Sequence, residues 1–329
     1  MDFGEEVVTM ALGAILAHSV ALPKGRLRKG ITLGAPEIAT LLAAGIERVT
    51  VARLGAQDVH EDAAALALAR ALVPEPEAAG LVLRAMGTGR VNILAAQAGI
   101  TRLNPAQIHA LNATHPMITL ATVPQWHRMD PGDMVGTVKI ISYGVPQTAL
   151  TKACAEARNG LSLCSAKLQN VVLLQTIVGA DDGEKGQHVT KVRVARLGAR
   201  LGPKTLVPHE IDDLAQAIAA QMADLILILT GSATSDAADT APEALRRAGG
   251  RLIHFGMPVD PGNLLFIGEI NGCPVIGLPG CARSPALNGA DWVLERMICG
   301  VPVTGADIAA MGVGGLLKEI PSRPKPRES

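Results

Sequence analysis

Small polar residues follow an apolar run in the C-terminal half of the chain, and their types suit the binding of an anion. The run Leu225 to Leu229 is wholly aliphatic, which predicts a strand buried on both faces. The loop Thr230 to Asp239 follows it, and a helix is expected near Pro242. Helix starts offer free N–H groups, and open α/β sheets bind ligands beyond the carboxyl ends of their strands. We therefore expect a pocket for a phosphate-bearing small molecule.

A second loop of the same kind lies further along the chain. Pro274 to Leu278 is predicted to be a short strand, and Pro279 to Pro285 is the turn after it. If both strands belong to one parallel sheet, the two loops meet at the same edge. Arg283 would then supply a guanidinium group, which suits a phosphate or a carboxylate. The alternative is two ordinary tight turns with Arg283 as a solvated charge.

Two other polar segments, His60-Glu61-Asp62 and Gly87 to Asn92, are weaker candidates. The first is equally well explained as the start of a helix, and the second as a turn rather than a phosphate loop. The eight histidines show no H-x-x-H or H-E-x-x-H spacing, so a zinc site built by the protein is not expected.

The composition favours a globular protein with ample material for buried cores. Of the 329 residues 48% are hydrophobic but only 2% aromatic, and 30 basic residues balance 30 acidic ones. A nucleic-acid partner is therefore not expected, because it needs a basic face or aromatic platforms. The five cysteines are an odd number without C-x-x-C spacing, which indicates free thiols in a reducing compartment. Without a secretory leader or a membrane-length apolar run, we expect a soluble, cytoplasmic protein.

The pattern of elements around the two loops predicts an α/β fold. Helices are expected over 36–44, 61–72, 105–112 and 211–220, with strands over 48–53, 117–123 and 171–178. An alanine-rich helix is also expected after Asn92, ending at Gly99. The C-terminal sheet should be mostly parallel and flanked by helices, because its strands alternate with helices.

Four segments are predicted along the chain. They are a small N-terminal α+β module, a β-rich or mixed module with a linker, an α/β domain that holds both loops, and a partly disordered tail: residues 1–78, 79–165, 166–305 and 306–329.

The C-terminal half resembles the molybdopterin-binding domain of molybdenum-cofactor biosynthesis proteins. In that family the first loop reads T-G-G-T-S-x-G-x-x-D before a Thr-Pro-Glu helix start, and P-G-K-P and G-L-P-G-N-P-x-S turns come later. The positions that carry the family's residue here are Thr230, Gly231, Asp239, Pro261, Gly262, Gly277, Leu278, Pro279, Gly280 and Ser284. The resemblance covers about residues 170 to 300. The N-terminal part more loosely resembles the linker and swivelling modules of molybdopterin molybdotransferase.

The resemblance implies that molybdopterin binds to these two loops. The residues implied in cofactor binding are Thr230, Gly231, Ser232, Ala233, Thr234, Ser235, Pro279, Gly280, Cys281, Arg283 and Ser284. Asp239 would be catalytic and, with Asp236, would bind Mg²⁺, since a carboxylate among phosphates usually works through this cation. The alternative for Asp239 is a helix cap, and for Asp236 a solvated loop acid.

Several positions depart from the family pattern. Ser232 and Asp236 replace glycines, Asn263 replaces the lysine after Pro261-Gly262, and Cys281 replaces an asparagine. Asp260 also stands before Pro261 instead of a lysine. Positive charge beside a phosphate or nucleotide is therefore reduced, which weakens the case for nucleotide chemistry.

The sequence thus predicts a molybdopterin-binding protein of molybdenum-cofactor biosynthesis. If it is an enzyme, Mg²⁺-assisted molybdate insertion by a molybdopterin molybdotransferase-like transferase is the expected step. The alternative is a non-enzymatic carrier that serves a molybdopterin nucleotidyltransferase or a molybdenum hydroxylase. A third reading is a nucleotide- or phosphosugar-binding enzyme that shares only the sheet topology. The family's habit of self-association makes a homo-oligomer the expected state.

Overall fold

The computed structural model describes residues 1–317, which divide into two compact units. Residues 1–97 and 101–163 form the first unit, and residues 98–100 and 164 onwards form the second. The division lies close to the boundary expected between residues 165 and 166. Residues 318–329, which belong to the predicted tail, lie outside the described residues.

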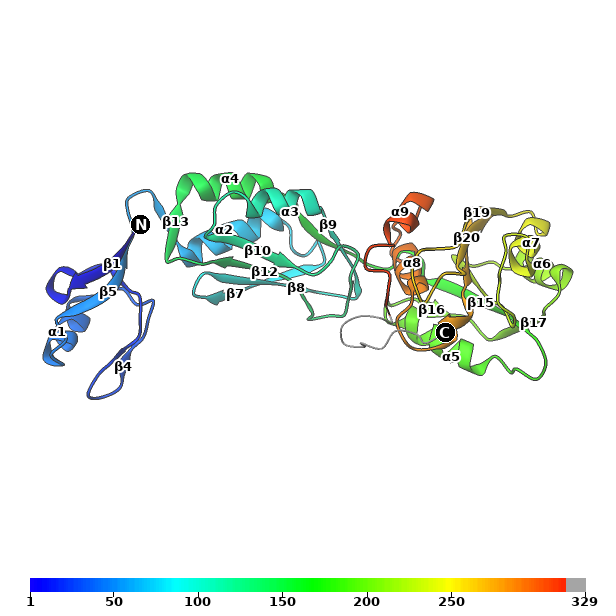
Figure 1. Cartoon of the computed structure of the whole chain (residues 1–329), viewed down its shortest axis with the longest axis horizontal. Coiled ribbons are helices and arrows are strands. Elements are labelled where there is room, and N and C mark those ends of the chain that lie inside the picture. The colour runs from blue at the N-terminus through cyan, green and yellow to red at the C-terminus, as the bar shows by residue number, and fades with distance from the viewer. Residues whose placement is uncertain (318–329) are drawn as a thin grey trace. The chain divides into compact units, whose positions relative to one another are not determined.

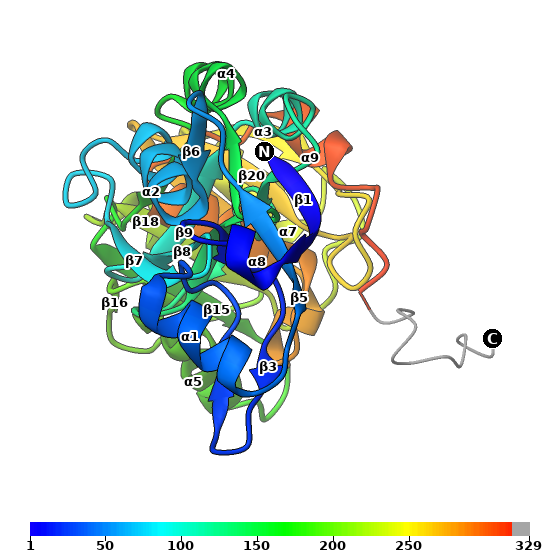
Figure 2. The same ribbon diagram turned by 90° about the vertical axis from the view of Figure 1, so that its left-hand side faces the viewer.

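The first unit begins with a small antiparallel sheet in the order β1-β5-β2, which faces the viewer in Figure 2. The elements of this part are β1 (Asp2–Val7), η1 (Val8–Met10), β2 (Ile15–Leu16), the paired β3 (Val20–Ala21) and β4 (Arg26–Leu27), α1 (Ala35–Ala43) and β5 (Arg48–Arg53). Val8, Leu16, Leu33, Leu41 and Val49 form its own small core. The predicted helix 36–44 and strand 48–53 are therefore present.

The larger part of the first unit is a four-stranded antiparallel sheet in the order β10-β12-β8-β7, covered on one face by helices α2, α3 and α4 (Figure 1). The sheet and its helices are β7 (Leu81–Gly87), β8 (Arg90–Ala95), β10 (Ile118–Thr122), β12 (Met134–Ile140), α2 (Glu61–Leu72), α3 (Pro105–Asn112) and α4 (Gln147–Ala157). Short pairings link β6 (Asp58–His60) with β13 (Gly144–Pro146), and β9 (Gly99–Leu103) with β11 (Arg128–Met129) and β14 (Leu161–Cys164).

One hydrophobic core joins α2 to the sheet. Ala65 and Leu68 of α2 pack in the same cluster as Ile93 and Val138 of the sheet, and all four are fully buried. The module boundary expected at residue 78 falls inside this core, because the apolar face of α2 covers the strands that follow it.

The segment after Asn92 does not form the predicted helix, because residues 93–95 continue a strand and residues 96–98 form a bend. Residues 90–95 form β8, which lies between β7 and β12 and is hydrogen-bonded to both. The two-residue turn Thr88-Gly89, in which both residues have positive φ, turns the chain back from β7. Such a turn suits the twist of a hairpin, so strand pairing outweighs the helical preference of alanine.

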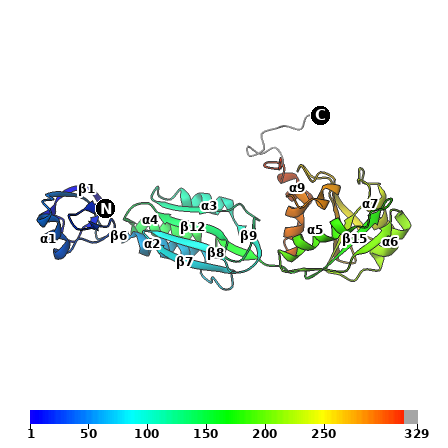
Figure 3. The ribbon, with the colours of Figure 1, turned by 90° about the horizontal axis from the view of Figure 1, so that it is seen from below.

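The second unit is built on a seven-stranded sheet within its described residues, with helices on both sides (Figures 1 and 3). The strand order is β16-β15-β18-β21-β20-β19, and β17 also pairs with β15. The strands are β15 (Asn170–Ile177), β16 (Arg200–Leu201), β17 (Thr205–Pro208), β18 (Leu225–Leu229), β19 (Arg251–Phe255), β20 (Phe266–Ile270) and β21 (Cys273–Leu278). Four of these pairings are parallel and two, at the β19–β20–β21 edge, are antiparallel. The mostly parallel sheet expected from the sequence is therefore present.

The helices of the second unit cover the central strand, β18, on its two faces. They are α5 (Glu184–Ala195), α6 (Ile211–Ala219), α7 (Thr240–Arg247), the short η2 (Gly280–Arg283), α8 (Gly289–Ile298) and α9 (Gly305–Ala310). Every residue of β18 is buried, and Ile226 and Ile228 pack with residues of α6 and α7.

The described part of the predicted tail is ordered, since it contains most of α9 and Leu316 pairs with Asp260. Within residues 1–317 no helix is both long and apolar enough to cross a bilayer.

Gly277, one of the motif positions, is required by packing against Phe266. The two residues face each other across β20 and β21, and a Cβ atom at position 277 would lie 1.9 Å from the phenyl ring. Phe266 is 1% exposed, so the ring has no space to move into. We therefore expect Gly277→Ala to lower the free energy of unfolding by about 1–3 kcal/mol through overpacking.

Urea unfolding followed by Trp292 fluorescence in a Trp126→Phe background measures this loss. Gly202→Ala is the matched control, because its added Cβ would meet only atoms at 3.6 Å or beyond and should change stability by no more than about 0.5 kcal/mol. Equal stabilities of the two variants would contradict the packing role.

Candidate functional site

The two predicted loops lie side by side at one edge of the sheet in the second unit. Strands β18 and β21 are parallel neighbours, with Leu229 opposite Leu278, so Thr230 and Pro279 leave the sheet together. The Arg283 guanidinium joins the loops directly, because its Nη2 donates to the carbonyl oxygen of Thr230 at 2.8 Å. The loops therefore converge as the sequence predicts, and binding of a ligand by Arg283 stays a prediction.

The first loop is held in shape by its own threonines. The Thr230 hydroxyl donates to the Ser232 carbonyl at 2.6 Å and lies 3.1 Å from the Thr234 hydroxyl. Both threonines are buried, whereas Gly231, Ser232 and Ala233 are exposed. These hydroxyls therefore stabilise the loop, and their binding of a ligand stays a prediction.

The backbone of the same loop leaves hydrogen-bond donors open. Among residues 1–317, the N–H groups of Ser232, Ala233 and Thr234 have no acceptor. Three successive N–H groups in an exposed loop are a donor set for an anion. Gly231 allows this loop to run close to β15, because a Cβ there would lie 2.8 Å from the carbonyl oxygen of Thr176.

Asp239 acts as the N-cap of α7. One carboxylate oxygen accepts from the N–H of Thr240 at 2.7 Å, and the other accepts from the N–H of Ser235 at 2.9 Å. The Ser235 N–H is the main cause that lowers the pKa of Asp239, and the Thr240 N–H and the charge of His209 act in the same direction against burial. This geometry is that of a helix cap, the alternative expected for Asp239.

Asp236 is also engaged with the loop backbone, since its carboxylate accepts from the N–H of Ala238 at 2.7 Å. Over the described residues there is no group of three or more His, Cys, Asp or Glu side chains that could hold a metal ion. Binding of Mg²⁺ by Asp236 and Asp239 stays a prediction.

The second loop is shaped by Arg193, which the sequence reading did not single out. From α5, its guanidinium donates to the carbonyl oxygens of Ala282 at 2.6 Å, Ser284 at 2.8 Å and Ala286 at 3.1 Å. It also forms an ion pair with Asp291, and both side chains are almost fully buried. These contacts fix the path of residues 282–286. Cys281 lies half-buried in the same loop.

Thr176 and His209 complete this edge and were also missed. Strands β15 and β17 are parallel neighbours that end beside the first loop. The buried Thr176 hydroxyl accepts from the N–H of Gly231 at 2.9 Å and lies 2.7 Å from His209 Nδ1. The signal that could have found both residues is their place at the carboxyl ends of strands of a parallel sheet.

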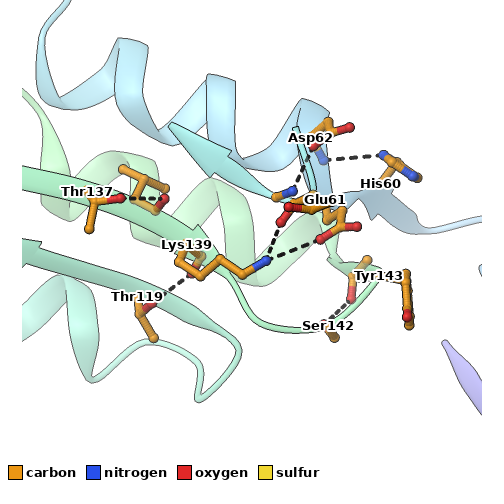
Figure 4. A network of polar contacts seen from close by, with 12 residues as sticks. His60, Glu61, Asp62, Thr119, Thr137, Lys139, Ser142 and Tyr143 are labelled. Carbon is orange, nitrogen blue, oxygen red and sulfur yellow. Dashed lines mark hydrogen bonds and ion pairs between the residues drawn. The ribbon is translucent and has the colours of Figure 1, made fainter. Parts of the chain in front are cut away.

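The two weaker polar segments meet in the first unit, where they stabilise a turn (Figure 4). Asp62 accepts from the N–H of Gly89 at 2.7 Å, and Lys139 Nζ lies 3.4 Å from Glu61 Oε2 and donates to the carbonyl oxygen of Thr88. His60 caps α2 by accepting from the N–H of Asp62 at 3.3 Å. These contacts hold the β7–β8 turn against the start of α2, which supports the helix-start and turn alternatives.

Comparison with known proteins gives little beyond this geometry. A family model described as a domain of unknown function (DUF8806) matches residues 7–53. No curated protein sequence matches the chain.

Two solved structures are similar at low levels. The molybdopterin biosynthesis MoeA protein from Pyrococcus horikosii has 14% identity and a TM-score of 0.34, over 91% of this chain and 75% of that one. A molybdenum cofactor biosynthesis protein from Pyrococcus furiosus has 12% identity and a TM-score of 0.25, over 92% of this chain and 66% of that one. Scores of this size do not establish a common overall fold.

Proposed function

We propose that the second unit binds molybdopterin through its phosphate and acts in molybdenum-cofactor biosynthesis or delivery. The observation that carries the proposal is the junction of the two loops by Arg283 beside the open N–H groups of Ser232 to Thr234. The motif resemblance over residues 230–284 supplies the identity of the ligand. The geometry alone supports any small molecule with a terminal phosphate.

The electrostatics of this edge are consistent with an anionic ligand. Arg283 donates one hydrogen bond to the carbonyl oxygen of Thr230. A guanidinium group has five N–H donors, so others are available to a ligand. The nearby acids Asp236 and Asp239 are already neutralised in part by backbone N–H groups. A phosphate held by Arg283 and the open N–H groups therefore meets donors on two sides.

Two features favour a carrier role over catalysis: the Asp239 carboxylate is already engaged, and the family's lysines are replaced. Asp239, the predicted catalytic residue, uses both oxygens to cap α7 and the loop. Asn263 and Asp260 stand where the family has lysines, so the charge that would stabilise a nucleotide is missing from that turn. The carrier would transfer its pterin to a molybdopterin nucleotidyltransferase or a molybdenum hydroxylase. We also propose that the chain forms a homo-oligomer. Magnesium- and ATP-dependent turnover of molybdopterin would instead favour the molybdotransferase-like reaction.

Mass spectrometry of the small molecules that co-purify with the full chain tests the binding proposal. We expect a pterin phosphate with the wild-type protein and about ten- to a hundredfold less with Arg283→Ala, since a charged hydrogen bond to the phosphate is lost. Arg251→Ala, at an exposed arginine on β19, should retain the wild-type amount. Absence of a pterin from the wild type, or equal retention by Arg283→Ala, would contradict the proposal.

A further inference from the structure

His209 lies at the same sheet edge as the proposed phosphate site, but on the side opposite the second loop. It follows β17 directly, and β15 lies between β17 and β18. The imidazole is half-buried and reaches Thr176 through its Nδ1 atom. None of the motifs in the two loops includes this residue.

The hydrogen bonds of Thr176 assign the tautomer of His209. Thr176 Oγ1 already accepts the Gly231 N–H, and within residues 1–317 the only other partner of this oxygen is His209 Nδ1. If Nδ1 carried the proton, the threonine hydroxyl hydrogen would have no acceptor in a buried position, which is costly. The hydroxyl therefore donates to Nδ1, and the neutral imidazole carries its proton on Nε2.

The Nε2–H group is consequently a donor that the described part of the chain does not use. Thr176 Oγ1 bonds both His209 Nδ1 and the N–H of Gly231, so the ring lies close to the first loop. Asp239 itself is occupied by the N–H groups of Ser235 and Thr240. The half-buried ring leaves Nε2 available to an acceptor from outside the chain, such as an anion bound at the first loop.

We propose that His209 is a ligand-binding residue whose Nε2–H donates to a phosphate monoester at this edge, while Thr176 holds the ring through Nδ1. The inference rests on the proposed function for the site and adds a third contact beside Arg283 and the loop N–H groups. It also supplies a donor in a site where the family's lysines are replaced by Asn263 and Asp260.

Two substitutions separate binding of the ligand from support of the loop. Asparagine places its side-chain oxygen near the position of Nδ1, so His209→Asn keeps the contact with Thr176 and loses the far donor. Glutamine reaches the position of Nε2 with an N–H group, so His209→Gln keeps the far donor and loses the contact with Thr176. A ligand-binding residue and a supporting residue therefore predict opposite orders of affinity.

The probe is phenyl phosphate, titrated into the full chain and followed by ³¹P NMR. We expect His209→Asn to weaken binding by about ten- to a hundredfold and His209→Gln by no more than about threefold. If His209→Asn binds as the wild type does, or both variants bind equally well or equally poorly, the inference is overturned. A wild-type protein that fails to bind phenyl phosphate overturns the phosphate site itself, which separates failure of the proposed function from failure of this inference.

A second measurement checks the tautomer without any ligand. The ¹⁵N chemical shifts of the His209 ring at neutral pH, assigned with His209→Gln as the spectrum that lacks it, should show a protonated Nε2 and an unprotonated Nδ1. A protonated Nδ1 would overturn the assignment. Thr176→Val should then change the tautomer balance, whereas Thr176→Ser should leave it unchanged.

Discussion

Replacing Arg193 with methionine is expected to lower the free energy of unfolding of the second unit by about 3–5 kcal/mol. The guanidinium group is the partner of three backbone carbonyl groups and of the Asp291 carboxylate. Because the Arg193 and Asp291 side chains are only 11% and 8% exposed, water cannot take over these contacts. Methionine has a similar size but leaves a buried carboxylate without a counter-charge.

Urea unfolding followed by Trp292, the residue next to Asp291, measures the loss when Trp126 is replaced by phenylalanine. Arg193→Lys keeps the charge but not the planar set of donors, so it should lie between the wild type and Arg193→Met. Arg251→Met is the matched control, since its ion pair with Glu269 is exposed and should contribute no more than about 1 kcal/mol. A loss for Arg193→Met no larger than that of the control would show that the loop does not depend on this residue.

Arg193→Met should also weaken phosphate binding, because residues 282–286 include Arg283 and its neighbours in the second loop.

Arg193 illustrates why part of the site could not be predicted from the sequence. It lies on a helix about 90 positions before the loop that it holds, and its neighbours give no motif. Only the folded arrangement of α5 against η2 brings it to the carbonyl groups.

The loops themselves were predictable because their position follows from a local rule. The aliphatic run Leu225–Leu229 indicates a buried parallel strand, and the residues after such a strand lie at the ligand-binding edge. The same rule applied to β15 and β17 would have found Thr176 and His209. Those strands end in less conspicuous segments, and a single histidine is more often a structural residue than a ligand.

Long-range pairing explains why the helix predicted in the first unit is absent. A helix was predicted after Asn92, but residues 90–95 pair with strands on both sides, and one of these comes from residues 134–140. The core that joins α2 to this sheet likewise brings together residues from both sides of position 78. Propensity and local patterns describe neither of these contacts.

Replacing Lys139 with methionine is the second substitution with a large expected effect, and it acts on the first unit. Glu61 has a side chain that is 8% exposed, and its counter-charge is the ammonium group of Lys139 at 3.4 Å. The same ammonium group donates to the carbonyl oxygen of Thr88 in the tight turn before β8. Its loss leaves both a buried carboxylate and a turn carbonyl without their partner. Since Lys139 is itself 30% exposed, we expect a loss of about 2–3 kcal/mol, below the range for a fully buried pair.

Trp126 fluorescence in a Trp292→Phe background reports unfolding of the first unit and measures this loss. Arg48→Met is the matched control, because Arg48 and Glu5 form an exposed ion pair that should contribute no more than about 1 kcal/mol. The double variant Lys139→Met/Glu61→Leu should recover most of the stability, since an apolar pair of similar volume replaces two buried charges at little net cost. If Lys139→Met is no more destabilising than the control, or if the double variant is less stable than Lys139→Met, the carboxylate of Glu61 does not depend on this lysine. The convergence of the two polar segments would then contribute nothing to holding the turn.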